Sequence, residues 1–247
     1  MRLRIGHMYP DLMNLYGDRG NVIALARRLQ WRGIEAETVG IAVGDAADLG
    51  DFDLLFMGGG QDREQAIVWR DLEARREDLR RAMEADVVLL AVCGGYQLLG
   101  HYYRMPDGRE IPGLGILDLH TEAGPTRMIG NAACRSEYLP EPGTLVGFEN
   151  HGGRTYLGPG CAPLATVLSG HGNNGEDGGE GAVYRNVFGT YLHGSLLPKN
   201  PHFADLLLGR ALARRGAGTM GDPLDDSLEW RAHRVALGLA GVDGREA

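Results

Sequence analysis

The sequence is poor in cysteine and nearly free of lysine, and it contains no long apolar run. Its three cysteines, Cys93, Cys134 and Cys161, are too few and too scattered for a disulfide framework, and they lack the paired spacing of a zinc site. No stretch reaches the roughly 18 apolar residues that a membrane-spanning helix needs. The N-terminus carries no apolar signal-peptide core. We therefore expect a cytoplasmic protein.

Other classes of function also lack support. A net charge of −8 over 247 residues argues against nonspecific nucleic-acid binding as the main role. The pattern Gly-x-x-x-x-Gly-Lys-Ser/Thr is absent, so the sequence predicts no ATP site of that kind. No two His, Cys, Asp or Glu residues have a ligand-pair spacing above chance, so we predict no metal site.

The first half alternates between strand-like and helix-like segments. Apolar residues recur at helical spacing over 22–29, with Gly33 as a plausible stop, and the charged segment 63–84 is typical of a surface helix. This alternation predicts the α/β class, with a mostly parallel central sheet flanked by helices. Such sheets bind ligands at the carboxyl ends of their strands. The predicted strands are 3–8, 36–41, 52–57 and 87–92.

The second half has a different pattern. From 113 to 193 we expect extra short strands broken by Gly and Pro, with 183–192 the clearest of them. Helices are predicted at 201–215 and 228–239. No linker divides the chain, so we predict a single domain over 1–247, with its core at about 3–215 and a C-terminal helical extension over 216–247.

Cys93 is the strongest candidate for chemistry. It follows the run 87–92 and precedes Gly94, Gly95 and a helical pattern that begins at Tyr96. This is the layout of a nucleophile elbow, in which a sharp turn presents the side chain at a helix N-terminus. Glycine suits the adjacent positions because the turn is strained, and the helix N-terminus favours a thiolate. An isolated cysteine is more often a small buried hydrophobe, but this context favours a nucleophile.

A thiolate needs a proton shuttle, and His193 is the strongest candidate. It ends the strand-like run 187–192 and precedes Gly194, so we expect it at a strand end. The alternative is a hydrogen-bonded core or loop histidine. His151, in Glu149-Asn-His-Gly-Gly-Arg, is the main rival. Weaker contexts surround the other six histidines, His7, His101, His120, His171, His202 and His233.

Two glycine segments could stabilise an oxyanion. Gly58-Gly59-Gly60 follows a predicted buried strand, and its backbone N–H groups could act together with that of Gly94. The alternative for the first segment is a plain strand-to-helix turn.

Three polar residues are candidates for contact with a substrate. Arg127, near Asn131, could pair with a carboxylate, although a solvated arginine is the commoner outcome. Asp18 precedes a helix and would ordinarily be its N-cap, but it also follows the first strand and could meet the substrate.

Several motifs together resemble one known family. Gly58-Gly-Gly-Gln-Asp, Val92-Cys-Gly-Gly-Tyr-Gln and Gly189-Thr-Tyr-Leu-His-Gly resemble the class I glutamine amidotransferases of the cobyric-acid-synthase (CobB/CobQ-like) type. Three more segments narrow the resemblance to the glutaminase subunits of lipid II isoglutaminyl synthases. These are Asn14-Leu-Tyr-Gly-Asp-Arg-Gly-Asn, Glu149-Asn-His-Gly-Gly-Arg-Thr and Leu196-Leu-Pro-Lys-Asn-Pro. The resemblance extends from about residue 5 to residue 215.

The resemblance implies a flavodoxin-like fold and a glutaminase. Cys93 would attack the side-chain amide of glutamine and His193 would be the general acid/base. Gly60 and Gly94 would hold the oxyanion. Gln97 and Arg127 would hold glutamine.

The resemblance also implies a partner subunit. Ammonia would pass to a Mur-ligase-like partner (MurT) that uses ATP and Mg²⁺ to amidate the D-glutamate α-carboxyl of lipid II, while this subunit needs no cofactor of its own. One departure is Ser195, which stands where class I triads place Glu, two residues after the histidine. A Cys–His dyad is therefore expected, with its orienting group unidentified. Two alternatives are a glutaminase subunit of a cobyric or cobyrinic acid amidating enzyme and a non-catalytic binding subunit.

Overall fold

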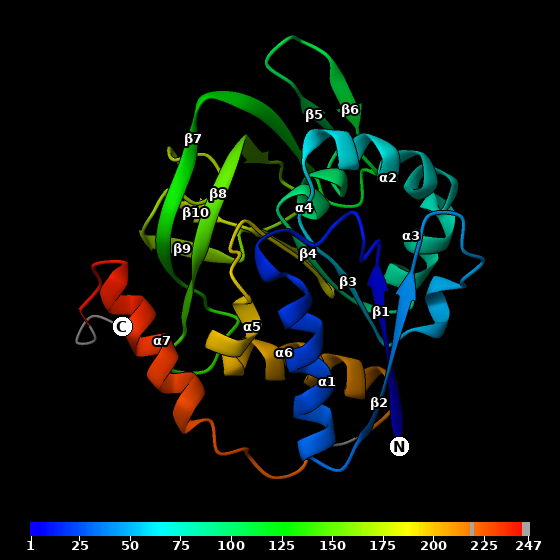
Figure 1. Ribbon diagram of the computed structural model, residues 1–247, viewed down its shortest axis with the longest axis vertical. Helices are drawn as coiled ribbons and strands as arrows, with labels where there is room; N and C mark the ends of the chain where they lie inside the picture. The colour runs from blue at the N-terminus through cyan, green and yellow to red at the C-terminus, as the bar shows by residue number, and fades with distance from the viewer. Residues whose placement is uncertain (218–219, 244–247) are drawn as a thin grey trace.

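The computed structural model describes residues 1–217 and 220–243, and its first sheet forms the core (Figure 1). This sheet has the strand order β11-β12-β4-β3-β1-β2, and all neighbouring pairs are parallel except β11 with β12. From β2 to β12 this is the flavodoxin-like order. The strands are β1 (Arg2–Met8), β2 (Glu35–Ile41), β3 (Leu54–Met57), β4 (Val88–Val92), β11 (Ala182–Tyr184) and β12 (Val187–Thr190).

Helices cover both faces of this sheet. On one face α1 (Arg19–Trp31) packs against α6 (Pro201–Arg214) and the short α5 (Leu196–Lys199). The other helices of the first half are α2 (Asp62–Ala74), α3 (Arg76–Glu84) and α4 (Gly94–Leu98), with single 3-10 turns at Leu15–Gly17 and Leu49–Asp51. Every residue of β3, β4 and β12 is buried, as expected for parallel strands covered on both faces.

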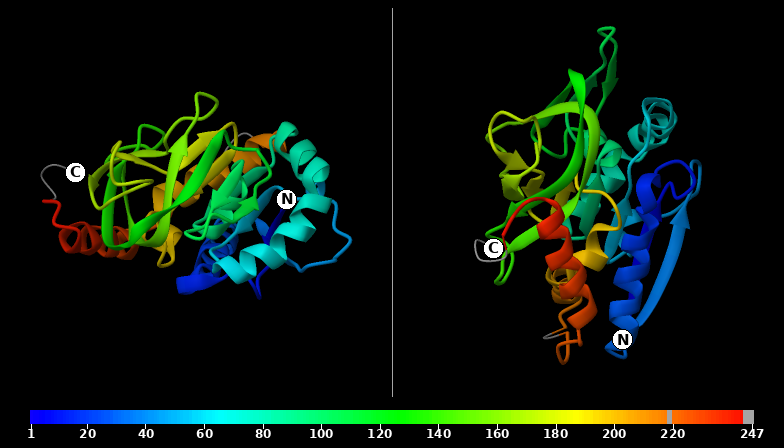
Figure 2. Two further views of the ribbon diagram at one scale, coloured as in Figure 1. Left: turned by 90° about the horizontal axis from the view of Figure 1, so that it is seen from above. Right: turned by 60° about the vertical axis from the view of Figure 1, so that its left-hand side comes forward.

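A second sheet lies beside the first, and both views in Figure 2 show it as a separate body of strands. Its order is β10-β9-β7-β5-β6, with β8 also paired to β7. Two of its strands have 17 and 14 residues, so they are longer than the short strands predicted for this region. The strands are β5 (Tyr102–Arg104), β6 (Glu110–Pro112), β7 (Leu119–Arg135), β8 (Thr144–Leu157), β9 (Ala165–Ser169) and β10 (Gly179–Glu180).

The predicted α/β fold with its parallel sheet is confirmed, with two local differences. The segment 63–84 forms two helices, because Arg75 leaves the helical path and its guanidinium binds Asp71 and the carbonyl of Ala47. The segment 183–192 is a hairpin: the chain reverses at Arg185, whose φ is +53°.

The C-terminal extension is partly described. Its helix α7 (Ser227–Leu239) packs along β7 and β8, where Leu237 joins a small cluster with Ala133 and Val146 (Figure 1). His233 Nε2 lies 2.8 Å from the hydroxyl of Thr144. Residues 218–219 and 244–247 of the predicted extension lie outside the described residues. No helix in the described part of the chain is long and apolar enough to cross a membrane.

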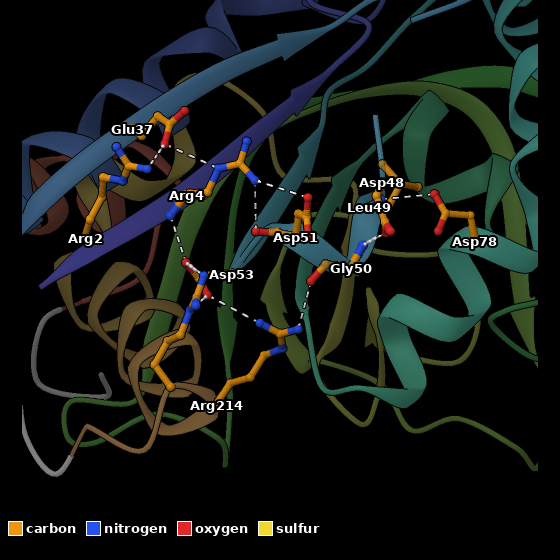
Figure 3. A network of polar contacts seen from close by, with 11 residues as sticks. Arg2, Arg4, Glu37, Asp48, Leu49, Gly50, Asp51, Asp53, Asp78 and Arg214 are labelled. Carbon is orange, nitrogen blue, oxygen red and sulfur yellow. Dashed lines mark hydrogen bonds and ion pairs between the residues drawn. The ribbon is translucent and has the colours of Figure 1, made fainter. Parts of the chain in front are cut away.

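A network of charges lies at the edge of the first sheet where β3 begins (Figure 3). Asp53 is completely buried there and forms ion pairs with Arg214 and Arg215 at the end of α6. It also accepts a hydrogen bond of 2.8 Å from the backbone N–H of Arg4 in β1. Asp53 therefore joins two strands and a helix at the edge opposite the carboxyl ends of the strands.

Candidate active site

The carboxyl ends of four neighbouring strands bring distant residues together. Asp18 lies beyond β1, Gly58–Gly60 beyond β3, Cys93 beyond β4 and His193 beyond β12. Because β1, β3, β4 and β12 are parallel neighbours, their ends meet at one edge of the sheet. The site is thus assembled by the topology of the sheet.

Cys93 occupies a strained turn between β4 and α4. Its φ is +50° and its ψ is −108°, a backbone conformation that L residues rarely adopt. The turn is held on both sides, since its N–H donates to the carbonyl of Thr190 (2.8 Å) and its carbonyl accepts from the N–H of Gln97 (2.9 Å). The side chain is 8% exposed and borders a cavity. This is the geometry of a nucleophile elbow.

His193 lies between Cys93 and a buried carboxylate. Its Nδ1 is 3.2 Å from Oδ1 of Asp18, and neither side chain is exposed. Its Nε2 is buried and has no hydrogen-bond partner among the described residues. Burial opposes the charged imidazole, but the charge of Cys93 and the hydrogen bond to Asp18 outweigh it and raise the pKa of His193 to about 10. A protonated, positively charged imidazole beside Cys93 is therefore favoured at neutral pH.

Asp18 is held in place by the loop after β3. Its Oδ2 accepts a hydrogen bond of 2.7 Å from the backbone N–H of Gly59. Its carboxylate makes no capping hydrogen bond to α1, so it does not play the ordinary N-cap role. A Cβ on Gly59 would lie 2.7 Å from Cε1 of His193 and 3.4 Å from both Asp18 Oδ2 and Cys93 Cβ. Glycine is needed here because these three side chains crowd the backbone.

The two glycines predicted to form an oxyanion hole are close neighbours. A Cβ on Gly94 would lie 2.9 Å from the nitrogen of Gly60. Neither glycine N–H donates a hydrogen bond within the part of the chain that the structure describes. The side-chain amide of Gln65 donates to the carbonyl of Gly60 (3.2 Å) and holds that peptide in place. Two N–H groups beside Cys93 that have no acceptor among the described residues can stabilise a negatively charged oxygen.

A cavity of about 610 Å³ opens in front of Cys93 and contains Arg127 at its wall. The register between β7 and β8 shifts between Ala123 and Met128, so the four residues from Gly124 to Arg127 bulge out of the ladder. Pro125 contributes because it cannot donate to the ladder. The guanidinium of Arg127 is held by the side chain of Asn150, at 2.8 and 3.0 Å.

A buried polar network forms the floor of this cavity. Gln97 donates to the hydroxyl of Tyr191 (3.0 Å) and accepts from Gln65 (3.1 Å). The ring of His151 stacks on that of Tyr191 with centroids 3.6 Å apart, and its Nδ1 lies 2.8 Å from the carbonyl of Gly153. Burial is the main cause that lowers the pKa of His151 to about 3. His151 is therefore neutral, and His193 is the imidazole beside Cys93 and a carboxylate.

The predicted site residues fall into two groups. The cavity wall contains Cys93, Gly60, Gln97 and Arg127, and His193 and Gly94 adjoin it. Asp18 is buried behind His193 and does not border the cavity, so the geometry places it on the imidazole rather than on a substrate. Asn131 lies outside the cavity because β7 continues past the bulge, and its side chain is exposed.

Ser195 stands where a triad glutamate was expected, and it supports the loop that carries Asp18. Its φ is +50°, and its hydroxyl donates to the carbonyl of Gly17 (3.0 Å). A Cβ on Gly20 would collide with the Ser195 side chain. The position of Asp18 beside Nδ1 of His193 was not predicted from the sequence. The available signal was its position at the end of the first strand.

Comparisons with known proteins agree with this geometry. The sequence profile described as the CobB/CobQ-like glutamine amidotransferase domain matches residues 4–201. The GatD subunit of lipid II isoglutaminyl synthase (glutamine-hydrolyzing) from Staphylococcus aureus (strain N315) is 43% identical over 96% of this chain and 96% of its own length. Cobyric acid synthase from Limosilactobacillus reuteri (strain DSM 20016) is 32% identical over 72% of this chain and 35% of its own length. The solved structure of PurLQS from Thermotoga maritima shares the fold, with a TM-score of 0.57 at 18% identity over 87% of this chain and 97% of that chain.

Proposed function

Because the chain belongs to the CobB/CobQ-like glutamine amidotransferase family, we propose that it is the glutamine-hydrolysing subunit of a lipid II isoglutaminyl synthase. The observation that carries the proposal is the convergence of Cys93, His193 and Asp18 beside a cavity that also holds a tethered arginine, Arg127. The similarity to GatD spans nearly the whole of both chains. This supports the same division of labour between subunits.

The first half-reaction forms an acyl-enzyme. The thiolate of Cys93 attacks the side-chain carbonyl carbon of glutamine, and the oxygen takes the charge. The N–H groups of Gly60 and Gly94 are the donors for that oxyanion. Protonated His193 then gives its Nε2 proton to the amide nitrogen, so that ammonia leaves and a γ-glutamyl thioester remains.

The second half-reaction consumes water. His193, now neutral, removes a proton from a water molecule as that water attacks the thioester carbonyl. Collapse of the second tetrahedral intermediate releases glutamate and returns the Cys93 thiolate beside an imidazolium. Asp18 accepts the Nδ1–H bond throughout, which fixes the ring orientation and favours the imidazolium. The balance is glutamine plus water giving glutamate plus ammonium, because the released carboxyl group passes its proton to ammonia through the solvent.

The cavity has groups that complement a free amino acid. Arg127 offers a guanidinium to an α-carboxylate. The Nε2 of His151 and the Oε1 of Gln65 are buried without hydrogen-bond partners among the described residues. Because His151 is neutral and its Nδ1 lies against a carbonyl, its Nε2 is an acceptor. Two acceptors and one cation match the α-ammonium and α-carboxylate of glutamine.

The proposal includes a partner subunit. The ammonia is a nucleophile for a carboxyl group that must first be activated, and within the proposal ATP and Mg²⁺ belong to a Mur-ligase-like subunit that does so. The acceptor is the D-glutamate α-carboxyl of lipid II, which becomes D-isoglutamine. A cobalamin-pathway glutaminase is the alternative. The match to GatD is 43% identical over 96% of this chain, whereas the match to cobyric acid synthase is 32% identical over 72% of this chain, and the higher similarity favours the cell-wall substrate.

Mixing the chain with the Mur-ligase-like partner tests the proposal. Glutamate release from glutamine is expected with wild type and is expected to fall to background in Cys93→Ala. Amidation of lipid II should require glutamine, ATP and both subunits. Glutamine hydrolysis that persists in Cys93→Ala would refute the mechanism, and hydrolysis coupled to a cobyrinate synthetase instead would refute the substrate.

A further inference from the structure

Tyr16 lies at the mouth of the active site on the loop between β1 and α1. Its φ is +53°, which is unusual for a residue with a bulky side chain, and it is 48% exposed. Its ring meets the imidazole of His193 edge-on, with centroids 5.0 Å apart and an interplanar angle of 73°. It also borders the cavity. A strained backbone conformation that holds an exposed tyrosine beside an imidazole indicates a functional role for the tyrosine.

The hydroxyl of Tyr16 ends a chain of hydrogen bonds that begins at Arg127. Nε and Nη2 of Arg127 donate to Oδ1 of Asn150, and Nη2 also donates to its backbone carbonyl (3.0 Å). Nδ2 of Asn150 then donates to the Tyr16 hydroxyl (2.8 Å). An amide that donates on one side presents its oxygen on the other. The Tyr16 hydroxyl thus helps to hold the side chain of Asn150 in the orientation that presents its oxygen to the guanidinium.

We propose that Tyr16 is a positioning residue that orients Arg127 toward the α-carboxylate of the substrate through Asn150, while its ring packs edge-on against His193. This deepens the proposed function and rests on it. The side chain of Tyr16 thereby contacts His193 directly and Arg127 through Asn150. Recognition of the amino-acid end of the substrate is coupled to the position of the loop that also supplies Asp18.

The role predicts a selective loss when only the hydroxyl is removed. In Tyr16→Phe the ring stays over His193, but Asn150 loses its acceptor and Arg127 loses its fixed orientation. Recognition of an α-carboxylate should weaken by about fivefold, which corresponds to about 1 kcal/mol for one hydrogen bond. The intrinsic reactivity of Cys93 should not change, because no hydrogen bond from the Tyr16 hydroxyl reaches Cys93 or His193 in the described structure.

Two electrophiles separate these effects in the full chain with its partner present. One is 6-diazo-5-oxo-L-norleucine, which carries the α-amino and α-carboxylate groups of glutamine, and the other is iodoacetamide, which carries neither. Labelling rates of the Cys93 peptide are followed by mass spectrometry. Tyr16→Phe should react about fivefold more slowly with the amino-acid reagent and within twofold of wild type with iodoacetamide. Tyr184→Phe is the matched control, because Tyr184 is 41% exposed on β11 and its hydroxyl makes no hydrogen bond in the described structure.

Further variants test whether the residues act in series. Asn150→Ala should give the same selectivity change, and the double variant Tyr16→Phe/Asn150→Ala should be no worse than Asn150→Ala alone. Equal slowing with both reagents, or no slowing with either, would overturn the inference. If wild type with its partner released no glutamate from glutamine, the proposed function would fail instead. The two failures are therefore distinguishable.

Discussion

The imidazole of His193 owes its charge to two neighbours from distant parts of the chain. Cys93 and Asp18 each raise its pKa, against the effect of burial. The carboxylate of Asp18 is fixed in turn by the N–H of Gly59. The ionisation of the site therefore depends on a residue that does not border the cavity.

Replacing Asp18 with Asn tests this dependence. Asp18→Asn keeps the size of the side chain but removes the charge, so the pKa of His193 should fall from about 10. The alkaline limb of kcat/KM, which reports loss of the proton that His193 donates, should move to lower pH. We expect kcat to fall by roughly 10²- to 10⁴-fold, as for other triads that lose their carboxylate. Asp11→Asn removes a charge from the same loop without touching His193, and an equal effect there would contradict the role of Asp18.

Gly59 offers a steric test of the same cluster. In Gly59→Ala the new methyl would lie 2.7 Å from Cε1 of His193, so the imidazole must shift away from Cys93. We expect kcat to fall by at least roughly 10²-fold, since a displacement of about 1 Å can have that effect. Gly209→Ala, in α6 with no neighbouring atom within 4 Å of the new Cβ, is the matched control. Steady-state glutamate release and thermal unfolding are the measurements. An active Gly59→Ala variant would show that the crowding is relieved elsewhere.

Cys93 could be predicted from the sequence because the pattern that marks it is local. Cys93 follows a buried strand and precedes two glycines, and that pattern is contained in a few residues. The link between Asp18 and His193 spans 175 positions and depends on which strand ends are neighbours. Periodicity reveals strands but not their order in the sheet, so the orienting carboxylate could not be identified. Class I triads place a glutamate two residues after the histidine, but here that position is Ser195, whose hydroxyl donates a hydrogen bond to the carbonyl of Gly17.

At the scale of elements, the strands of the first sheet were predictable because buried parallel strands form continuous apolar runs. The break between α2 and α3 was not, since Arg75 ends α2 by bonding to a loop that is distant in sequence. The length of β7 was also missed. Gly124 and Pro125 looked like strand breakers, but they form a bulge inside one strand and bring Arg127 to the cavity.

The ion pairs of Asp53 predict that replacing this residue lowers the stability of the fold without changing the hydrolysis of glutamine. Asp53→Ala would leave Arg214 without its buried partner and the N–H of Arg4 without its acceptor. Because Asp53 is fully buried, we expect the free energy of unfolding to fall by about 3 kcal/mol. Chemical denaturation measures the change, and KM for glutamine should stay within twofold. Asp51→Ala is the control, because Asp51 is exposed at the same edge of the sheet. If Asp53→Ala lowered the free energy of unfolding by less than Asp51→Ala does, the prediction would be contradicted.

For the whole molecule, the buried carboxyl of Glu180 predicts how stability depends on pH. Its Oε1 accepts from the Thr190 hydroxyl and the Tyr191 N–H, while Oε2 has no partner among the described residues. Burial raises its pKa from 4.5 to about 7. The folded state therefore holds a proton that the unfolded state has lost, so stability decreases as pH rises from 4.5 through 7.

Replacing Glu180 with Gln should remove this dependence. Wild type should lose about 3 kcal/mol of unfolding free energy across that range from this group, at 1.36 kcal/mol per pKa unit. Glu180→Gln should show a smaller difference between pH 5 and pH 8 in urea denaturation. Glu77→Gln, at an exposed position, should behave as wild type. Parallel pH curves for Glu180→Gln and wild type would show that Glu180 is already ionised at pH 5.

The separation of Asp18, Cys93 and His193 along the chain also has a consequence for biosynthesis. During synthesis on the ribosome, Cys93 emerges long before His193, and β12 takes its place beside β4 only after the second sheet has been made. Until then Cys93 lacks the imidazole of His193, which is the group that links it to the carboxylate of Asp18. The arrangement of Cys93, His193 and Asp18 therefore forms only after the chain has been synthesised at least as far as His193 and β12 has joined the first sheet.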